Sequence, residues 1–190
     1  EKNSFIKNQL NKDVNLIKKL YSSQGFKFAN IVSKVRKIDE NNYDIAFEID
    51  KGNLTKIKKI FFSGDKKVKE KRLRDIIASE EDKFWKVISN NSKFNEGQIS
   101  LDKRLLVNYY KNLGYYDVEV SSTSAEILDS SNVNLYYSIN AGNRFTFEKI
   151  ETIVDSTFDK KIFYPLNRSY QKIIGEYYSP SKVKRILDEI

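Results

Sequence analysis

The side chains able to carry chemistry in this 190-residue chain are carboxylates, lysines, tyrosines and hydroxyls, because the sequence contains neither cysteine nor histidine. Thiol nucleophiles, zinc sites built on cysteine or histidine, and histidine acid–base catalysis are therefore excluded. The run Glu80-Glu81-Asp82 lies in a polar stretch with no partner base, and the residues around Gly97 lack the spacing of a phosphate loop. We accordingly expect no enzyme activity, no metal site and no cofactor.

The charge balance is basic, since 34 lysines and arginines outnumber 26 aspartates and glutamates and give a formal net charge of +8. A biased composition explains such an excess, and binding to nucleic acid or to an anionic membrane surface are the alternatives. Lysine outnumbers arginine, whereas nucleic-acid readers usually depend on arginine, so the membrane surface is favoured over nucleic acid. One basic run is predicted to be a solvated face, with an anionic lipid or acidic partner as the alternative: Lys56, Lys58, Lys59, Lys66, Lys67, Lys69, Lys71 and Arg72.

An internal repeat supplies the elements that position these residues. The pattern Tyr-x-x-x-Gly-aromatic occurs at residues 21–26 and again at 110–115, and each copy ends an amphipathic helix. Period-two alternation at 43–49 returns at 133–139, and each run precedes a Gly-Asn pair. Gly25 and Gly114 are 89 residues apart, and Gly52 and Gly142 are 90 residues apart. A spacing kept through a helix and a strand indicates duplicated structural units.

The complete unit after Gly52 predicts the order strand, helix, helix, strand, strand. The three strands are expected at residues 57–62, 118–120 and 133–140, and the two helices at 68–77 and 101–113. A hairpin turn is expected at 129–132. Strands with alternating faces bury one side, and two amphipathic helices supply the cover. The predicted fold class is α+β, with a three-stranded sheet covered on one face by two helices.

The two ends of the chain are out of phase with this unit. Residues 1–52 hold only a last helix, with one apolar face formed by Ile6, Leu10, Val14, Ile17 and Leu20, followed by a hairpin. Residues 143–190 hold a first strand, a first helix and the start of another helix, where Ser179-Pro180 reads as an N-cap and first-turn proline. We expect the C-terminal part of one unit at 1–52, a complete unit at 53–142 and the N-terminal part of a third at 143–190, together a piece of a longer protein.

The repeat resembles the POTRA domains of BamA-type outer-membrane assembly factors. The resemblance rests on Ile57-Lys-Lys-Ile60-Phe-Phe62-Ser-Gly64, on Tyr110 to Tyr115 running into a strand, and on the boundary Ala141-Gly-Asn-Arg-Phe145. The stretch Lys83 to Phe94 resembles a tryptophan-containing insertion of the third POTRA unit in alphaproteobacterial members, which makes 53–142 the third unit. The last segment departs from the pattern, because it has Ile153-Val154-Asp155 where a glycine usually ends the first strand.

The resemblance implies a periplasmic, non-enzymatic scaffold attached to the outer membrane of a Gram-negative bacterium through a C-terminal barrel absent from this chain. It implies that the second strand binds partners by β-augmentation, in which an added strand pairs with a sheet edge. The implied partners are a BamB-like lipoprotein, other assembly subunits, and unfolded outer-membrane proteins whose insertion the scaffold guides, but no nucleic acid. The expected edge residues are Asp117, Val118, Glu119, Val120, Ser121 and Ser122, and the alternative is an ordinary edge strand guarded by its acidic residues.

Several aromatic residues are further candidates for partner contacts. Trp85, with Phe84 and Phe94, either anchors a partner or packs the insertion onto the core. Tyr136 is expected to be exposed, because its neighbours Leu135 and Tyr137 take the buried face. The tyrosine pairs at 109–110 and 115–116 are expected to pack at a helix end, with nucleobase stacking as the alternative.

Three other functions remain open for this sequence. The segment could belong to a related translocation or secretion pore that also carries POTRA units. It could be a basic nucleic-acid-binding repeat protein, which would show steep loss of binding with added salt. It could also be a structural spacer without a binding edge.

Overall fold

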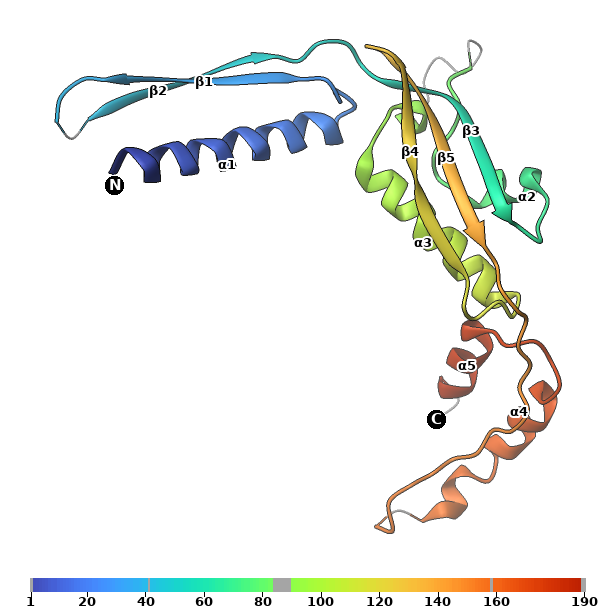
Figure 1. The fold of residues 1–190 in the computed structure, drawn as a ribbon. Coiled ribbons are helices and arrows are strands. Elements are labelled where there is room, and N and C mark those ends of the chain that lie inside the picture. The colour runs from blue at the N-terminus through green and yellow to red at the C-terminus, as the bar shows by residue number, and fades with distance from the viewer. Residues whose placement is uncertain (1, 41, 84–89, 158, 189–190) are drawn as a thin grey trace. The chain divides into compact units, whose positions relative to one another are not determined.

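A computed structural model describes residues 2–40, 42–83, 90–157 and 159–188, and the side chains of all of these except 2–6, 90, 122–124 and 160 (Figure 1). Contacts within the chain define two compact units, and both are discontinuous. The first unit comprises Glu1–Phe61, Ile77–Asp102 and Thr123–Tyr137, and the second comprises Phe62–Ile76, Lys103–Ser122 and Ser138–Ile190.

The first unit begins with a helix beside a two-stranded hairpin. Helix α1 (Lys2–Ser23) precedes β1 (Asn30–Lys37) and β2 (Tyr43–Asp50), which pair antiparallel from Asn30↔Asp50 to Lys37↔Tyr43. Leu10 of α1 and Ile31 of β1 are buried. Because successive side chains of a strand alternate between faces, the face opposite Ile31 carries two cross-strand ion pairs, Lys34–Glu48 and Arg36–Asp44.

The buried stripe of α1 is narrower than the sequence predicts. Leu10 is buried, Val14 and Ile17 are half-buried, and Leu20 is 57% exposed, so the predicted apolar face is buried only in part. The side chain of Ile6 lies outside the described residues. A hairpin of two strands is narrow, and it covers only part of the apolar surface that the helix carries.

A three-stranded sheet follows, formed by β3 (Lys56–Asp65), β4 (Glu119–Asp129) and β5 (Asn132–Asn140) in the order β3-β5-β4. Between β3 and β4 the chain forms α2 (Glu70–Ile76), the short helix η1 (Asn90–Ser92) and α3 (Glu96–Asn112). The predicted order of strand, helix, helix, strand, strand is confirmed, as is the α+β class. Each strand of this sheet begins in one compact unit and ends in the other.

Alternation along the strands places apolar side chains towards the helices. The buried apolar residues of this layer include Ile57, Ile60, Phe62, Val120, Val133, Leu135, Tyr137 and Ile139 from the strands, and Leu73, Leu106 and Tyr110 from the helices. In the first unit, the buried Asp102 of α3 accepts hydrogen bonds from Ala78 N (2.6 Å), Ser79 N (3.1 Å) and Tyr137 Oη (2.6 Å). Burial and the Asp102 carboxylate raise the pKa of Tyr137, so this hydroxyl stays a donor. This network ties α3, the segment after α2, and β5 together.

Gly64 ends β3 where two backbones come unusually close. Its φ is +82°, and a Cβ added there would lie 2.3 Å from the carbonyl oxygen of Ile139. Any other residue would therefore force the strands apart, which accounts for glycine at the end of the predicted strand.

The last part of the second unit contains η2 (Lys160–Phe163), α4 (Leu166–Ile173) and α5 (Pro180–Leu187). Leu166, Tyr170 and Ile186 form a small buried cluster. The N-cap prediction is confirmed, because Ser179 Oγ accepts from Lys182 N and Pro180 opens α5. The predicted first strand is wrong: its residues pair only at the isolated bridge Thr146↔Tyr177, since no described strand lies beside them to complete a ladder.

Candidate functional site

Strand β4 forms one edge of the three-stranded sheet, because the strand order leaves it paired with β5 alone. Outside helices and strand pairs, none of the backbone hydrogen bonds of the described residues involves residues 119–129. The outer N–H and C=O groups of such a strand are available to an added strand. Among the described residues, β4 therefore presents an open backbone edge.

The opposite edge, β3, is covered by the segment that follows α2. The carbonyl oxygen of Ile57 accepts a hydrogen bond from Asp82 N at 2.7 Å, and Ile60 N donates to Glu81 Oε1 at 3.0 Å. These bonds use backbone groups that an added strand would need. Within the described part of the chain, the two edges of the sheet are therefore unequal, and β4 is the more open.

The predicted edge residues differ in exposure: Asp117, Glu119 and Ser121 are exposed, Val118 and Val120 are buried, and the side chain of Ser122 lies outside the described residues. Ser121 Oγ lies 3.5 Å from the carbonyl oxygen of Ser138 on β5, which makes a weak hydrogen bond. The buried valines hold the strand to the core, so a partner would meet its backbone and its acidic and hydroxyl side chains.

The open edge is acidic, although the whole chain is basic. β4 reads Glu-Val-Ser-Ser-Thr-Ser-Ala-Glu-Ile-Leu-Asp and contains no lysine or arginine. Neither Asp117 nor Glu119 makes an ion pair with another described residue. Acidic side chains on an edge strand oppose association with a second acidic edge, because like charges directly opposite each other repel.

Tyr136 lies on the sheet face opposite the helices, as part of a cluster that sequence reasoning found only in part. Its ring stacks on Phe61 of β3, with centroids 4.9 Å apart and an interplanar angle of 17°. Its hydroxyl donates to Glu126 Oε2 at 2.5 Å, and Asn134 Nδ2 donates to the same oxygen at 2.9 Å. The two hydrogen bonds lower the pKa of Glu126, and the bond to the Glu126 carboxylate raises the pKa of Tyr136. The outward position of Phe61 between buried Ile60 and Phe62 is the sequence signal that could have located the stack.

Trp85 and Phe84 lie outside the described residues, so their predicted roles stay predictions. The third aromatic of that stretch, Phe94, is buried, and Lys27 Nζ lies 4.1 Å from its ring centroid. Among the tyrosine pairs, Tyr110 is buried and donates its hydroxyl to the carbonyl oxygen of Lys66. Tyr116 is half-exposed and packs against Tyr178, with ring centroids 5.2 Å apart.

The lysine-rich run is partly neutralised by nearby carboxylates. The ion pairs are Lys56–Asp82, Lys58–Asp82, Lys66–Glu70 and Lys67–Asp65. The hydrogen bond from Lys66 lowers the pKa of Glu70, which keeps that carboxylate charged. Exposed pairs of this kind add little stability, but they reduce the local positive charge that a nucleic acid or an anionic lipid would meet.

Two joints connect successive repeats, and we name them by their glycines. At the Gly25 joint, Thr55 N donates to the carbonyl oxygen of Gly25 at 2.8 Å, and Phe94 N donates to the carbonyl oxygen of Thr55 at 2.8 Å. At the Gly114 joint, Phe145 N donates to the carbonyl oxygen of Gly114 at 2.9 Å, and Tyr178 N donates to that of Phe145 at 2.9 Å. The Gly25 joint lies in the first compact unit and the Gly114 joint in the second. The repeat therefore extends to the backbone hydrogen bonds between its units.

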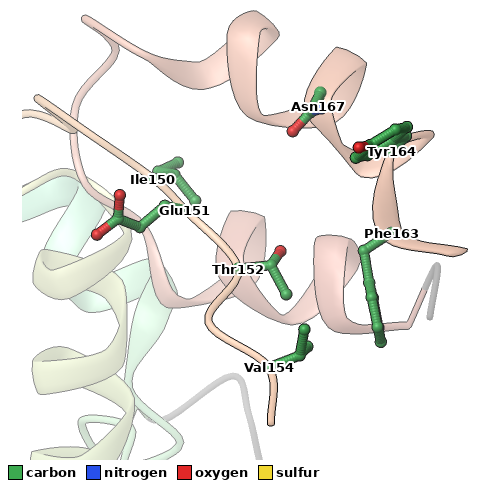
Figure 2. A pocket seen from close by; sticks show the side chains of 7 residues that line it. All are labelled: Ile150, Glu151, Thr152, Val154, Phe163, Tyr164 and Asn167. Atoms are coloured by element: carbon green, nitrogen blue, oxygen red, sulfur yellow. The ribbon is translucent and has the colours of Figure 1, made fainter. Parts of the chain in front are cut away.

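A pocket of about 220 Å³ lies in the last part of the second unit and is shown in Figure 2. The extended segment contributes Ile150, Glu151, Thr152 and Val154, and the helical segment across from it contributes Phe163, Tyr164 and Asn167. The carboxylate of Glu151 forms an ion pair with Lys149 (2.6 Å), and the hydroxyl of Thr152 shares a hydrogen bond with Tyr170 Oη. These polar groups are already hydrogen-bonded or ion-paired, and the apolar remainder continues the cluster of Leu166 and Tyr170.

Two absences limit the kind of site that the described residues can hold. Each helix among the described residues is either too short or too polar to span a bilayer. The described residues contain no group of three acidic side chains close enough together to hold a metal ion.

Comparison with known families decides what the repeat is. The POTRA family model, described as a surface antigen variable number repeat, matches residues 1–52 and 55–142. The chain belongs to the POTRA family. The resemblance that the sequence suggested is confirmed, and the two matched stretches meet near Gly52, where the repeat predicts a boundary.

Relatives of this POTRA chain are much longer proteins. It is 26% identical over 182 residues to the outer membrane protein assembly factor BamA of Neisseria meningitidis, covering 95% of this chain and 23% of the relative. It is 22% identical over 149 residues to BamA of Neorickettsia risticii, covering 78% of this chain and 20% of the relative. The chain thus spans less than a quarter of the length of these relatives.

Among solved structures, POTRA units 3–5 of Haemophilus influenzae BamA resemble this fold. The TM-score is 0.55 at 17% identity, and the match covers 95% of this chain and 69% of that one. At this identity the likeness concerns the fold, and it supports the tandem POTRA architecture.

Proposed function

We propose that this chain is a periplasmic scaffold segment of an outer-membrane protein assembly factor. Its support is membership of the POTRA family and similarity to BamA proteins, which are named as outer membrane protein assembly factors. On this proposal the chain has no enzymatic activity. It binds unfolded outer-membrane proteins and accessory subunits, a BamB-like lipoprotein among them, and guides the clients to insertion.

The proposed organisation follows the repeat. Residues 1–52 are the C-terminal part of one POTRA unit, 53–142 are a complete unit, and 143–190 are the N-terminal part of a third. The two joints at Gly25 and Gly114 support this division, because each has the same two backbone hydrogen bonds. Units that contact only their neighbours suit an extended scaffold.

The observation that carries the proposal is the inequality of the two sheet edges. The β3 edge is covered by Glu81 and Asp82, whereas β4 keeps its outer backbone groups available. Recognition through the backbone tolerates many sequences, because pairing depends on N–H and C=O groups that every strand offers. A factor that handles many different clients needs this tolerance.

Photo-crosslinking in the full-length protein, within its own cell envelope, tests the proposal. A photoreactive residue replaces Ser121 on the open edge, and a matched one replaces the exposed Lys58 on the covered edge. We expect the Ser121 position, and not the Lys58 position, to give adducts with outer-membrane proteins or lipoproteins identified by mass spectrometry. Adducts of equal yield from both positions, or none from Ser121, would contradict β-augmentation at β4.

A further inference from the structure

On the outer face of the sheet beside β4, the Glu126 carboxylate is only partly hydrogen-bonded to the described residues. Glu126 Oε2 receives both available donors, Tyr136 Oη and Asn134 Nδ2, while Glu126 Oε1 has no partner among the described residues. Asn134 is only 9% exposed, and its Oδ1 likewise has no partner there. The exposed Glu126 Oε1 is therefore left to be satisfied by a donor from outside the chain or by water, whereas Asn134 Oδ1 is buried.

The surroundings of the Glu126 carboxylate favour a positively charged donor. Glu126 is exposed, and its hydrogen bonds hold its pKa low, so it is ionised at neutral pH. Lysine and arginine are absent from β4, so no basic side chain of that strand competes for the carboxylate. Beside it, the stacked rings of Phe61 and Tyr136 present an aromatic surface, on which a guanidinium packs better than an ammonium.

The position of Glu126 relates this cluster to the open edge. Glu126 belongs to β4, so a strand paired with β4 would bring its own side chains next to the Glu126 carboxylate on the same face. Its backbone would take the free edge, and one side chain in every two would point to the outer face. Two features of a partner strand would thus be recognised. One is its backbone, which any strand has, and the other is a side chain that only some strands have.

We propose that the strand added to β4 carries an arginine beside Glu126, whose guanidinium donates to the free carboxylate oxygen and lies against the Phe61–Tyr136 stack. This inference rests on the proposed function, since it requires that β4 accept a strand. It adds that the accepted strands are basic at this position and that acidic strands are rejected.

Fluorescence anisotropy with synthetic peptides and the complete 190-residue chain tests the inference. The probes are a short labelled peptide of alternating threonine and valine with one central arginine, and two matched peptides with glutamine or glutamate in its place. We expect the arginine peptide to bind about fivefold to tenfold more tightly than the glutamine peptide, because its hydrogen bond is charge-assisted. The glutamate peptide should bind most weakly of the three.

Two variants assign the preference to the proposed site. Glu126→Gln should reduce the difference between the arginine and glutamine peptides to less than about twofold, because the amide oxygen has no negative charge to attract the guanidinium. Glu48→Gln, which removes the same charge from the exposed face of β2, should leave the difference unchanged. Circular dichroism of both variants checks that they fold.

The outcomes separate this inference from the proposed function. If the three peptides bind equally well, the edge accepts strands but the arginine preference is refuted. If the preference persists in Glu126→Gln, it arises elsewhere and the assignment to this cluster is wrong. If no peptide binds at all, β-augmentation at β4 fails, and the inference fails with it.

Discussion

The Gly25 and Gly114 joints have the same backbone hydrogen bonds but different side chains. Both use the same pair of backbone hydrogen bonds, and both place an isolated bridge next to them, Lys56↔Lys93 at the first joint and Thr146↔Tyr177 at the second. The side chains diverge: the buried Thr55 of the first joint corresponds to the exposed Phe145 of the second. The geometry of the connection is therefore set by the main chain and helix ends, and the side chains decide how firmly it holds.

Position 54 and its counterpart 144 make the difference concrete. Leu54 supplies only an apolar contact near Gly25. Arg144 instead donates Nε–H to the carbonyl oxygen of Leu113 at 2.8 Å, and its guanidinium carbon lies 3.3 Å from the ring centroid of Tyr177. At the second joint, a cationic side chain thus donates to a carbonyl oxygen at the C-terminal end of α3. At the first joint, the corresponding side chain is uncharged.

The largest expected effect comes from replacing the joint glycines. Both have positive φ, +97° for Gly25 and +99° for Gly114, which costs an ordinary residue about 1–2 kcal/mol. A Cβ on Gly114 would also lie 3.2 Å from the carbonyl oxygen of Phe145, whereas on Gly25 it would meet only the side chains of Leu54 and Lys93. We expect Gly114→Ala to lower the free energy of unfolding by about 2–3 kcal/mol and Gly25→Ala by about 1–2 kcal/mol.

Urea unfolding of the two alanine variants, followed by circular dichroism, measures these losses. Gly175→Ala is the control for the backbone conformation alone, because Gly175 has a φ of +80° and an added Cβ there would have nothing within 4 Å. Equal losses at the two joints would show that the backbone contact at Gly114 relaxes, and would remove this part of the contrast.

An intermediate loss of stability is expected when the helix cap that is hydrogen-bonded at each joint is removed. Asn95 Oδ1 accepts from Gln98 N at 3.1 Å while its Nδ2 donates to the carbonyl oxygen of Ser23 at 2.6 Å. Ser179 Oγ caps α5 and donates to Asn112 Oδ1 at 2.6 Å. Alanine at either position removes a cap and a tie, for a loss of about 1–2 kcal/mol.

Hydrogen exchange of the backbone amides locates these losses. Asn95→Ala should speed exchange of Thr55 and Phe94, and Ser179→Ala that of Phe145 and Tyr178, each at its own joint. Faster exchange at both joints in either variant would mean that the joints open together, which would contradict this prediction.

The smallest change in stability is expected when the side chains that distinguish the two joints are exchanged. Arg144→Leu gives the second joint the residue of the first, and it should cost about 0.5–1 kcal/mol because the site is largely exposed. The converse, Leu54→Arg, should gain little, since Lys93 stands where Tyr177 stands at the second joint and offers no ring. Thermal unfolding of the two variants measures both changes, and a stabilising Arg144→Leu would reverse the roles assigned to these residues.

The repeat made most of this fold predictable. Glycine after a tyrosine-ended helix placed Gly25 and Gly114, and serine before proline placed the cap of α5, because these residues act locally. The edge position of the second strand followed from the unit order. The covering of the β3 edge could not be predicted from the sequence, because Glu81 and Asp82 reach β3 from an irregular stretch with no periodic signal.

Other features depended on neighbours that the sequence does not display. The stack of Phe61 on Tyr136 joins residues of non-consecutive strands, so alternation alone exposes both without pairing them. The extended segment after Phe145 has a strand pattern, yet pattern is insufficient where no described strand lies alongside. Leu20 likewise fits the apolar face of α1 and is exposed, because the surface it faces is narrow.

The joints also constrain how such an array can evolve. A bond from a backbone N–H to a glycine carbonyl survives almost any substitution at the donor residue other than proline, as threonine at 55 and phenylalanine at 145 illustrate. After a duplication, each joint can therefore accumulate its own side chains by drift or selection while the connection is inherited intact. The glycines are the positions where divergence should be slowest, and the residues between them are where individual units acquire separate identities.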